Sequence, residues 1–392
     1  MNDRFKILLG IALAVLMLQP VVVDVAAQGS MPEHSTMPNL PTTPPVHEKR
    51  PDGSEFISTD VIAIMANGQA PMIHFWYAAD ENGTIAKFSL LYLGIVEFED
   101  QNGDDAFQSN ETLYYAPLAA YEWTLLTGTT EDDEGHVTEI WLKYVKGGLR
   151  SGGMMPSMPQ VDARGASAVQ RFEDVTIQIW SHIYLYDYQG NVSDDTGVKA
   201  TYLVQGNSEV KMDIEIGNFP FSTNTSSVAL QTLLRESDLV GQQNTYRHRY
   251  RIRDRHGNVT GMSNVNWNGA PGNESMIEPF PTDHIQRIDL FDAETGVTQG
   301  FYSWVDKAEI TWPGGTTEAV NVTASYVPTG TGLAVYLAYP NFDDGTLLHD
   351  PSVGVYPEAA PLTEPVGNTT LAVALGAVAV IAVAAFLVRR RR

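Results

Sequence analysis

The feature that most constrains the fold is a series of short β-prone runs separated by hairpin turns. Between residues 61 and 98, runs rich in Val, Ile, Phe and Tyr are interrupted at Asn67-Gly68 and Asn82-Gly83. Asn-Gly dipeptides favour the tight turns that join antiparallel strands. Between the two ends of the chain, no segment keeps a 3.6-residue apolar period for more than about two turns. The sequence therefore predicts a mainly β protein whose ectodomain is antiparallel and sandwich-like.

Apolar runs at both ends predict export and anchoring. Residues 1–27 carry two basic residues, an apolar run and small residues before Gln28, the order of a secretory signal peptide. Residues 371–388 contain no charge and no proline, and arginines at 389–392 follow at once. Such a run is long enough to cross a bilayer, and the positive-inside rule places the arginines in the cytoplasm. We expect a single-pass cell-membrane protein with its N-terminus and ectodomain outside. The alternative is a C-terminal sorting signal that is removed.

Composition divides the ectodomain into segments. Residues 28–57 are rich in Pro, Ser and Thr and are expected to form a disordered leader, whereas residues 147–168, rich in Gly, Pro and Met, are expected to form a flexible loop or linker. Two β-rich units are expected at 58–146 and 169–355. Residues 356–370 then form a stalk to the membrane.

Charge and cysteine content limit the partners and the means of stabilisation. The chain has a formal net charge of −23 and no cysteine. A strongly acidic surface repels nucleic acid and attracts divalent cations. Because no disulfide is available, the exported region must be stabilised by its hydrophobic core.

Asparagines in Asn-X-Ser/Thr sequons are more frequent than chance predicts, which indicates N-glycosylation. These asparagines are Asn82, Asn110, Asn191, Asn224, Asn258, Asn273, Asn321 and Asn368. The signal, the acidic cysteine-free ectodomain, the Pro/Thr stalk, the single helix and the terminal arginines give an architecture that resembles archaeal membrane-anchored surface glycoproteins. The resemblance implies a location at the cell surface rather than an activity.

An acidic loop is the strongest candidate metal site. Asp100, Asn102, Asp104 and Glu111 occupy positions 1, 3, 5 and 12 of a twelve-residue loop, a spacing that supplies oxygen ligands to calcium. The stretch resembles the calcium loop of EF-hands and dockerins, but Asp105 stands where those loops have glycine. Calcium in a stabilising role is one interpretation, and an acidic hairpin turn is the other. A second acidic stretch, from residue 343 to residue 350, has no ligand spacing and is interpreted as a turn.

Five arginines alternate along one predicted strand. They are Arg247, Arg249, Arg251, Arg253 and Arg255. Alternation places them on one face, as an anion-binding ladder for a polyanion, a sulfated glycan or an acidic subunit, or as partners of acidic side chains within the fold. The stretch 209–216 has the complementary design, with Val210, Met212, Ile214 and Ile216 inward and Glu209, Asp213 and Glu215 outward beside Lys211. The internal ladder is the favoured interpretation.

Catalytic motifs are missing from the sequence, which contains no nucleophile elbow, phosphate-binding loop, dinucleotide fingerprint or zinc spacing. The sequence therefore predicts a non-catalytic surface glycoprotein, structural or adhesive, with calcium stabilisation as one interpretation of its acidic loop. The first alternative is a receptor-type ectodomain that binds a polyanion, glycan or protein through the arginines and exposed aromatic residues at 74–77. The second is an extracellular hydrolase, which needs only two carboxylates.

Overall fold

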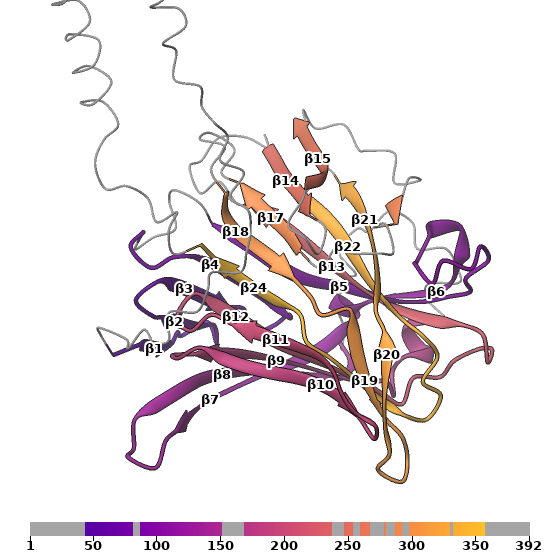
Figure 1. Ribbon diagram of the computed structural model, residues 1–392, viewed down its shortest axis with the longest axis horizontal. Helices are drawn as coiled ribbons and strands as arrows, with labels where there is room; N and C mark the ends of the chain where they lie inside the picture. The colour runs from indigo at the N-terminus through magenta and orange to yellow at the C-terminus, as the bar shows by residue number, and fades with distance from the viewer. Residues whose placement is uncertain are drawn as a thin grey trace, which may run out of the picture.

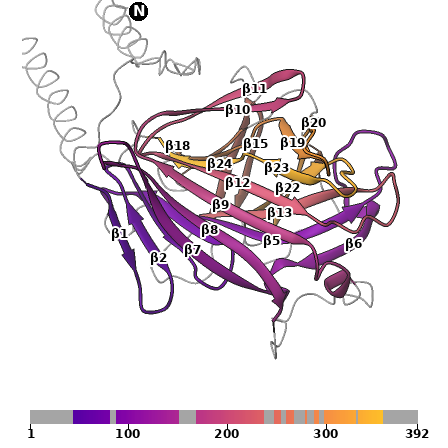
Figure 2. The ribbon, with the colours of Figure 1, turned by 90° about the horizontal axis from the view of Figure 1, so that it is seen from below.

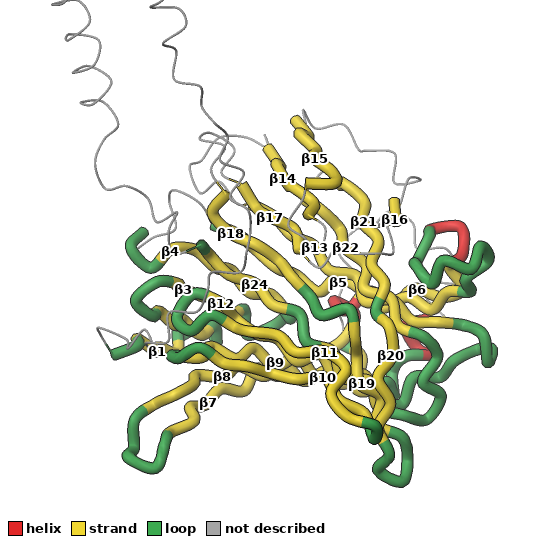
Figure 3. The backbone as a smooth tube through the Cα atoms, viewed as in Figure 1, coloured by secondary structure: helices red, strands yellow, loops and turns green. Residues whose placement is uncertain are grey.

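The computed structural model of the chain describes residues 44–80, 87–150, 168–236, 247–253, 259–266, 278–279, 287–291, 298–329 and 332–356. These residues form a mainly β structure, with 63% strand and 4% helix in antiparallel sheets (Figures 1 and 3). The prediction of an antiparallel β fold is confirmed. The expected signal peptide, transmembrane helix and terminal arginines lie outside the described residues. Within the described part of the chain, no helix is long and apolar enough to cross a membrane.

The first sheet has ten strands. In spatial order these are β1 (Val46–Lys49), β2 (Glu55–Ser58), β3 (Ile62–Ala66), β4 (Met72–Tyr77), β5 (Phe88–Phe98), β13 (Ser227–Glu236), β22 (Gly332–Tyr339), β21 (Thr323–Thr329) and β16 (Glu278–Pro279). The remaining strand, β6 (Thr112–Pro117), pairs with the second half of β5, while β4 pairs with the first half.

The second sheet has twelve strands and forks at β12 (Glu209–Gly217). One edge of β12 pairs with β9 (Thr176–Tyr184), followed by β8 (Val137–Leu149) and β7 (Tyr121–Glu131). The other edge pairs first with β24 (Ser352–Val355) and then with β23 (Thr346–His349). Beyond β24 lie β18 (Thr298–Ser303), β17 (Arg287–Phe291), β14 (Arg247–Arg253) and β15 (Val259–Asn266); beyond β23 lie β19 (Lys307–Thr311) and β20 (Thr317–Asn321).

A separate hairpin, β10 (Tyr188–Asp194) and β11 (Gly197–Val204), lies against the outer side of the second sheet (Figure 2). β10 contacts β19 and β20, and β11 contacts β12. The hairpin therefore covers part of a sheet face that alternation alone would leave in water.

One hydrophobic core lies between the two sheets. It joins Phe75 and Phe88 of the first sheet to Tyr144, Ile179 and Tyr302 of the second, all at 1% exposure or less. The expected units 58–146 and 169–355 contribute strands to both sheets, because β5 pairs with β13 and β8 pairs with β9. Their strands are therefore interleaved around a shared core.

Ordered structure includes parts of the two segments that composition predicts to be disordered or flexible, the leader and the linker. β1 and β2 lie inside the expected disordered leader, where Ile57 is fully buried and Glu55 is within 3.2 Å of the His47 ring. The prediction of disorder is therefore wrong from Val46 onward, because β2 places Ile57 in the core and the exposed β1 pairs with β2. At the end of the expected linker, Ala168 is also fully buried in the core.

Candidate functional site

The acidic loop after β5 is organised by hydrogen bonds to its own backbone. Oδ1 of Asp100 accepts the N–H groups of Asn102 (3.1 Å) and Gly103 (2.8 Å), and Oδ2 accepts that of Asp105 (2.9 Å). The side chain of Asn102 donates to Oδ2 of Asp104 at 3.0 Å. Burial raises the pKa of Asp100, but these backbone donors outweigh it and hold the pKa below its usual value. Three of the four predicted calcium ligands thus share one turn.

Glu111 closes the other end of this loop. It is 2% exposed, and its two oxygens accept the N–H groups of Gln101 (3.0 Å) and Gln108 (3.1 Å). Asp105 has a φ of +58°, the left-handed conformation that position 6 of a calcium loop usually gives to glycine. The backbone at position 6 therefore has the conformation of a calcium loop although the residue there is Asp105 and not glycine. Calcium binding remains a prediction.

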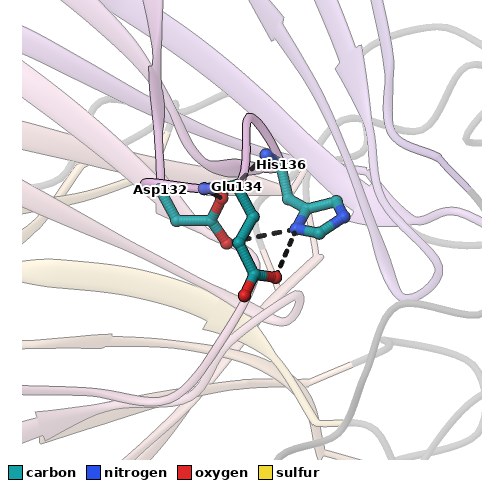
Figure 4. A group of neighbouring side chains, drawn as sticks. All are labelled: Asp132, Glu134 and His136. Carbon is teal, nitrogen blue, oxygen red and sulfur yellow. Dashed lines mark hydrogen bonds and ion pairs between the residues drawn. The ribbon is translucent and has the colours of Figure 1, made fainter.

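A different group of metal-ligating side chains lies in the turn between β7 and β8 (Figure 4). Nδ1 of His136 is 3.3 Å from Asp132 Oδ2 and 3.6 Å from Glu134 Oε2. Within the described residues, this is the group whose ligand atoms all lie within 4.8 Å of one another. All three side chains are exposed, and Asp132 Oδ1 also accepts the N–H groups of Glu134 and His136 at 2.9 and 2.8 Å. Closure of a tight turn accounts for this cluster.

Four of the predicted glycosylation sites lie in the described part of the chain. Asn110, Asn191, Asn224 and Asn321 are all exposed. The other four, Asn82, Asn258, Asn273 and Asn368, lie outside the described residues. Every sequon that the structure describes therefore presents its asparagine to solvent, as a glycan acceptor requires.

The arginine run forms a strand from Arg247 to Arg253, and Arg255 lies outside the described residues. β14 pairs with β15 and β17, with Arg251 opposite Asp289 and Arg253 opposite Arg287. β12 pairs instead with β9, β23 and β24. β12, the strand with the complementary design, is therefore not a neighbour of the arginine strand, and the internal ladder remains a prediction.

Alternation along β12 is confirmed on one face and wrong on the other. Val210, Met212, Ile214 and Ile216 are fully buried, as predicted. Glu209 and Lys211, expected to face water, are 7% and 5% exposed. Lys211 is buried because the β10–β11 hairpin places Tyr202 over it, with Nζ 5.4 Å from the ring centroid.

Burial of this face creates a charged cluster that sequence reasoning missed. His182 of β9 lies between a carboxylate of β8 and one of β12: Nδ1 contacts Glu139 Oε1, and Nε2 is 3.2 Å from Asp213 Oδ2. Burial would lower the pKa of His182, but the hydrogen bonds and charges of Asp213 and Glu139 outweigh it and raise the pKa to about 9. His182 is therefore a buried imidazolium at neutral pH.

Lys211 continues the cluster to the fork of the sheet. Its Nζ contacts Oδ1 of Asp213 and lies 2.8 Å from Oδ1 of Asp350, in the turn between β23 and β24. Two cations, Lys211 and His182, thus face three carboxylates, those of Glu139, Asp213 and Asp350. Burial raises the pKa of Asp350 to about 6, while the ammonium of Lys211 and the ring of His182 lower that of Asp213 despite its burial. In the sequence these residues are isolated charges, and no motif indicates the cluster, because they come from three distant strands and a turn.

An aromatic column supports the cluster from the side. The rings of Trp180 and Tyr184 lie on either side of His182, each with its centroid 5.8 Å away and nearly parallel. Imidazolium between aromatic faces gains cation–π stabilisation.

The aromatic residues at 74–77, which were expected to be exposed, are buried: Phe75, Trp76 and Tyr77 are at most 3% exposed. That stretch therefore packs in the structure and cannot serve as an aromatic surface for a ligand.

No protein-family model matches the chain, and no curated protein matches it significantly.

Proposed function

We propose that this chain is a non-catalytic cell-surface glycoprotein with a structural or adhesive role, exported by residues 1–27 and held at the membrane by residues 371–388. The observation that supports it best is the exposure of Asn110, Asn191, Asn224 and Asn321. Glycosylated asparagines must lie at the surface, and buried sequons would have counted against the proposal.

The end of the described fold also suits a protein that bears load from an anchor. Tyr356, the last described residue, donates its N–H to Gln299 O at 3.1 Å and its hydroxyl to Asp289 Oδ1 at 2.7 Å. Its carbonyl accepts the hydroxyl of Tyr77 at 2.9 Å. Because β24 pairs on both sides, with β12 and β18, tension on the predicted stalk would act on an interior strand.

Glycopeptide mapping and protease treatment of intact cells test this proposal. The full chain is expressed in cells that glycosylate Asn-X-Ser/Thr sites, and occupancy is measured at each sequon. We expect glycans on the exposed asparagines. Thr112→Ala, which keeps Asn110 but removes its sequon, should lose the glycan at Asn110. Protease added outside the cells should digest the ectodomain. Unmodified sequons together with an ectodomain protected in intact cells would overturn the proposal.

A further inference from the structure

The fork of the second sheet brings an amine and a carboxyl group together in a place that excludes water. Nζ of Lys211 and Oδ1 of Asp350 are 2.8 Å apart, and the two side chains are only 6% and 9% exposed. The N–H of Met212 donates to the carbonyl of Pro351 at 2.8 Å, which fixes the turn against β12. A third group, the Asp213 carboxylate, contacts the same Nζ.

We propose that Lys211 and Asp350 are joined by an intramolecular amide bond between Nζ and Cγ, formed by the folded protein itself with Asp213 as the proton carrier. No cofactor or oxidant is needed, because the step is a condensation. The reaction uses only groups that the fold already holds in contact.

In this step the Lys211 ammonium loses two protons, its nitrogen forms a bond to Cγ of Asp350, and one Cγ–O bond breaks. Both protons end on the departing oxygen, which leaves as water. Asp213 accepts a proton from the ammonium and passes it to the leaving oxygen, so it ends as the carboxylate that it was at the start. One positive and one negative charge disappear together.

The surroundings favour this condensation in two ways. Holding the reacting groups in contact replaces an encounter in solution, which greatly raises the effective concentration. Removing a buried ammonium and a buried carboxylate also removes the cost of keeping two charges out of water. Burial raises the pKa of Asp350 to about 6, so its departing oxygen accepts the protons that leave Lys211 more readily than an exposed carboxylate would. One effect opposes the step: burial would lower the pKa of Lys211, but Asp350 and Asp213 outweigh it and raise the pKa, so the ammonium must give its proton directly to a carboxylate in contact with it.

The bond would take the place of a disulfide in a chain that has no cysteine. It would join β12 to the turn between β23 and β24, at the point where the two branches of the sheet meet. Under tension from the C-terminal side, a covalent link there would stop unfolding that begins at β24 from passing Asp350 to β23.

Peptide mapping of the full chain tests the proposal. The protein is unfolded in denaturant, digested with trypsin and chymotrypsin and analysed by mass spectrometry. We expect the peptide containing Lys211 to be linked to the peptide containing Asp350, lighter than their sum by one water, with no tryptic cleavage after Lys211. Separate peptides of full mass from the wild-type chain would overturn the proposal. A water loss confined to the peptide that contains both Lys211 and Asp213 would also overturn it.

Three variants define the roles. Lys211→Arg and Asp350→Ala remove the two bonded groups, and each must abolish the linked peptide. Asp213→Asn keeps both bonded groups but cannot accept the proton, and we expect the linked fraction to fall at least tenfold; an unchanged fraction would refute the role of Asp213. Lys199→Arg is the matched control, because Lys199 also pairs with a carboxylate, Asp194 at 3.3 Å, but lies in the β10–β11 hairpin.

Discussion

Replacing His182 by Gln is expected to destabilise the protein and to remove a defined part of its pH dependence. The pKa of His182 is raised from 6.5 to about 9 by Asp213 and Glu139, against the opposing effect of burial. Since each pH unit corresponds to about 1.4 kcal/mol, the imidazolium contributes about 3 kcal/mol to folding. The side chain is 15% exposed, so solvent screening removes little of this value.

The sign of the effect follows from the raised pKa. The folded protein binds the proton more tightly than the unfolded chain does, so the contribution is complete below pH 6.5 and is lost as the pH rises through about 9. The groups that face His182 are Glu139 of β8, Asp213 of β12 and the rings of Trp180 and Tyr184 on its own strand. In the Gln variant Glu139 loses its cation and Asp213 keeps only Lys211, so the contribution of the imidazolium is absent at both pH values.

Urea unfolding followed by tryptophan fluorescence measures this prediction at about pH 6 and about pH 9.5. Lys146, whose pKa burial lowers to about 8, titrates in the same window with the opposite sign, but it is present in both proteins and cancels in their difference. His136→Gln, in the exposed turn between β7 and β8, is the control, because it makes the same substitution away from the cluster of His182, Glu139 and Asp213. If wild type and His182→Gln lose the same stability between the two pH values, the buried imidazolium is not the cause.

Three further changes test other parts of the structure. Millimolar calcium should raise the thermal midpoint of the wild type but not of the Asp100→Ala, Asp104→Ala variant, if the acidic loop binds the ion. Gly190→Ala should cost about 1–3 kcal/mol in urea unfolding, because its Cβ would lie 2.1 Å from the Tyr202 ring. Burial lowers the pKa of His349 from 6.5 to about 4, so the wild type should lose stability as the pH falls through this range, and His349→Gln should lose less in the same unfolding assay.

Each of these tests has a control. Asp343→Ala changes an exposed carboxylate of another turn and should leave any calcium response intact, whereas no response in the wild type would make the loop an acidic turn. Gly148→Ala meets nothing within 4 Å and should be nearly neutral; equal costs at Gly148 and Gly190 would refute the steric argument. His74, with its pKa also lowered to about 4, remains in both proteins of the acid comparison. If wild type and His349→Gln lose the same stability as the pH falls, His349 is excluded as a contributor.

The sequence predicted local features well, because they depend on neighbouring residues. The alternation of Val210, Met212, Ile214 and Ile216 identified four buried side chains on one face of β12. The missing helical period predicted the antiparallel β fold. The acidic loop and the exposed sequon asparagines lie in turns and on strands whose conformation is also set locally.

Sequence reasoning failed where composition or alternation was applied to contacts that other segments decide. The leader looked unstructured because prolines dominate its composition, yet Ile57 finds a place in the core. The outer face of β12 looked solvated because it is charged, yet a hairpin folds over it.

What the sequence by itself determined about this protein is its β class, the core face of its strands and the candidate sites built from a single loop. Only the tertiary structure decided which strands are neighbours. Glu139, His182, Lys211 and Asp350 meet because β12 joins β9 on one edge and the turn between β23 and β24 on the other. Strand pairing between distant segments is fixed by how the whole core packs, and no local pattern encodes that choice.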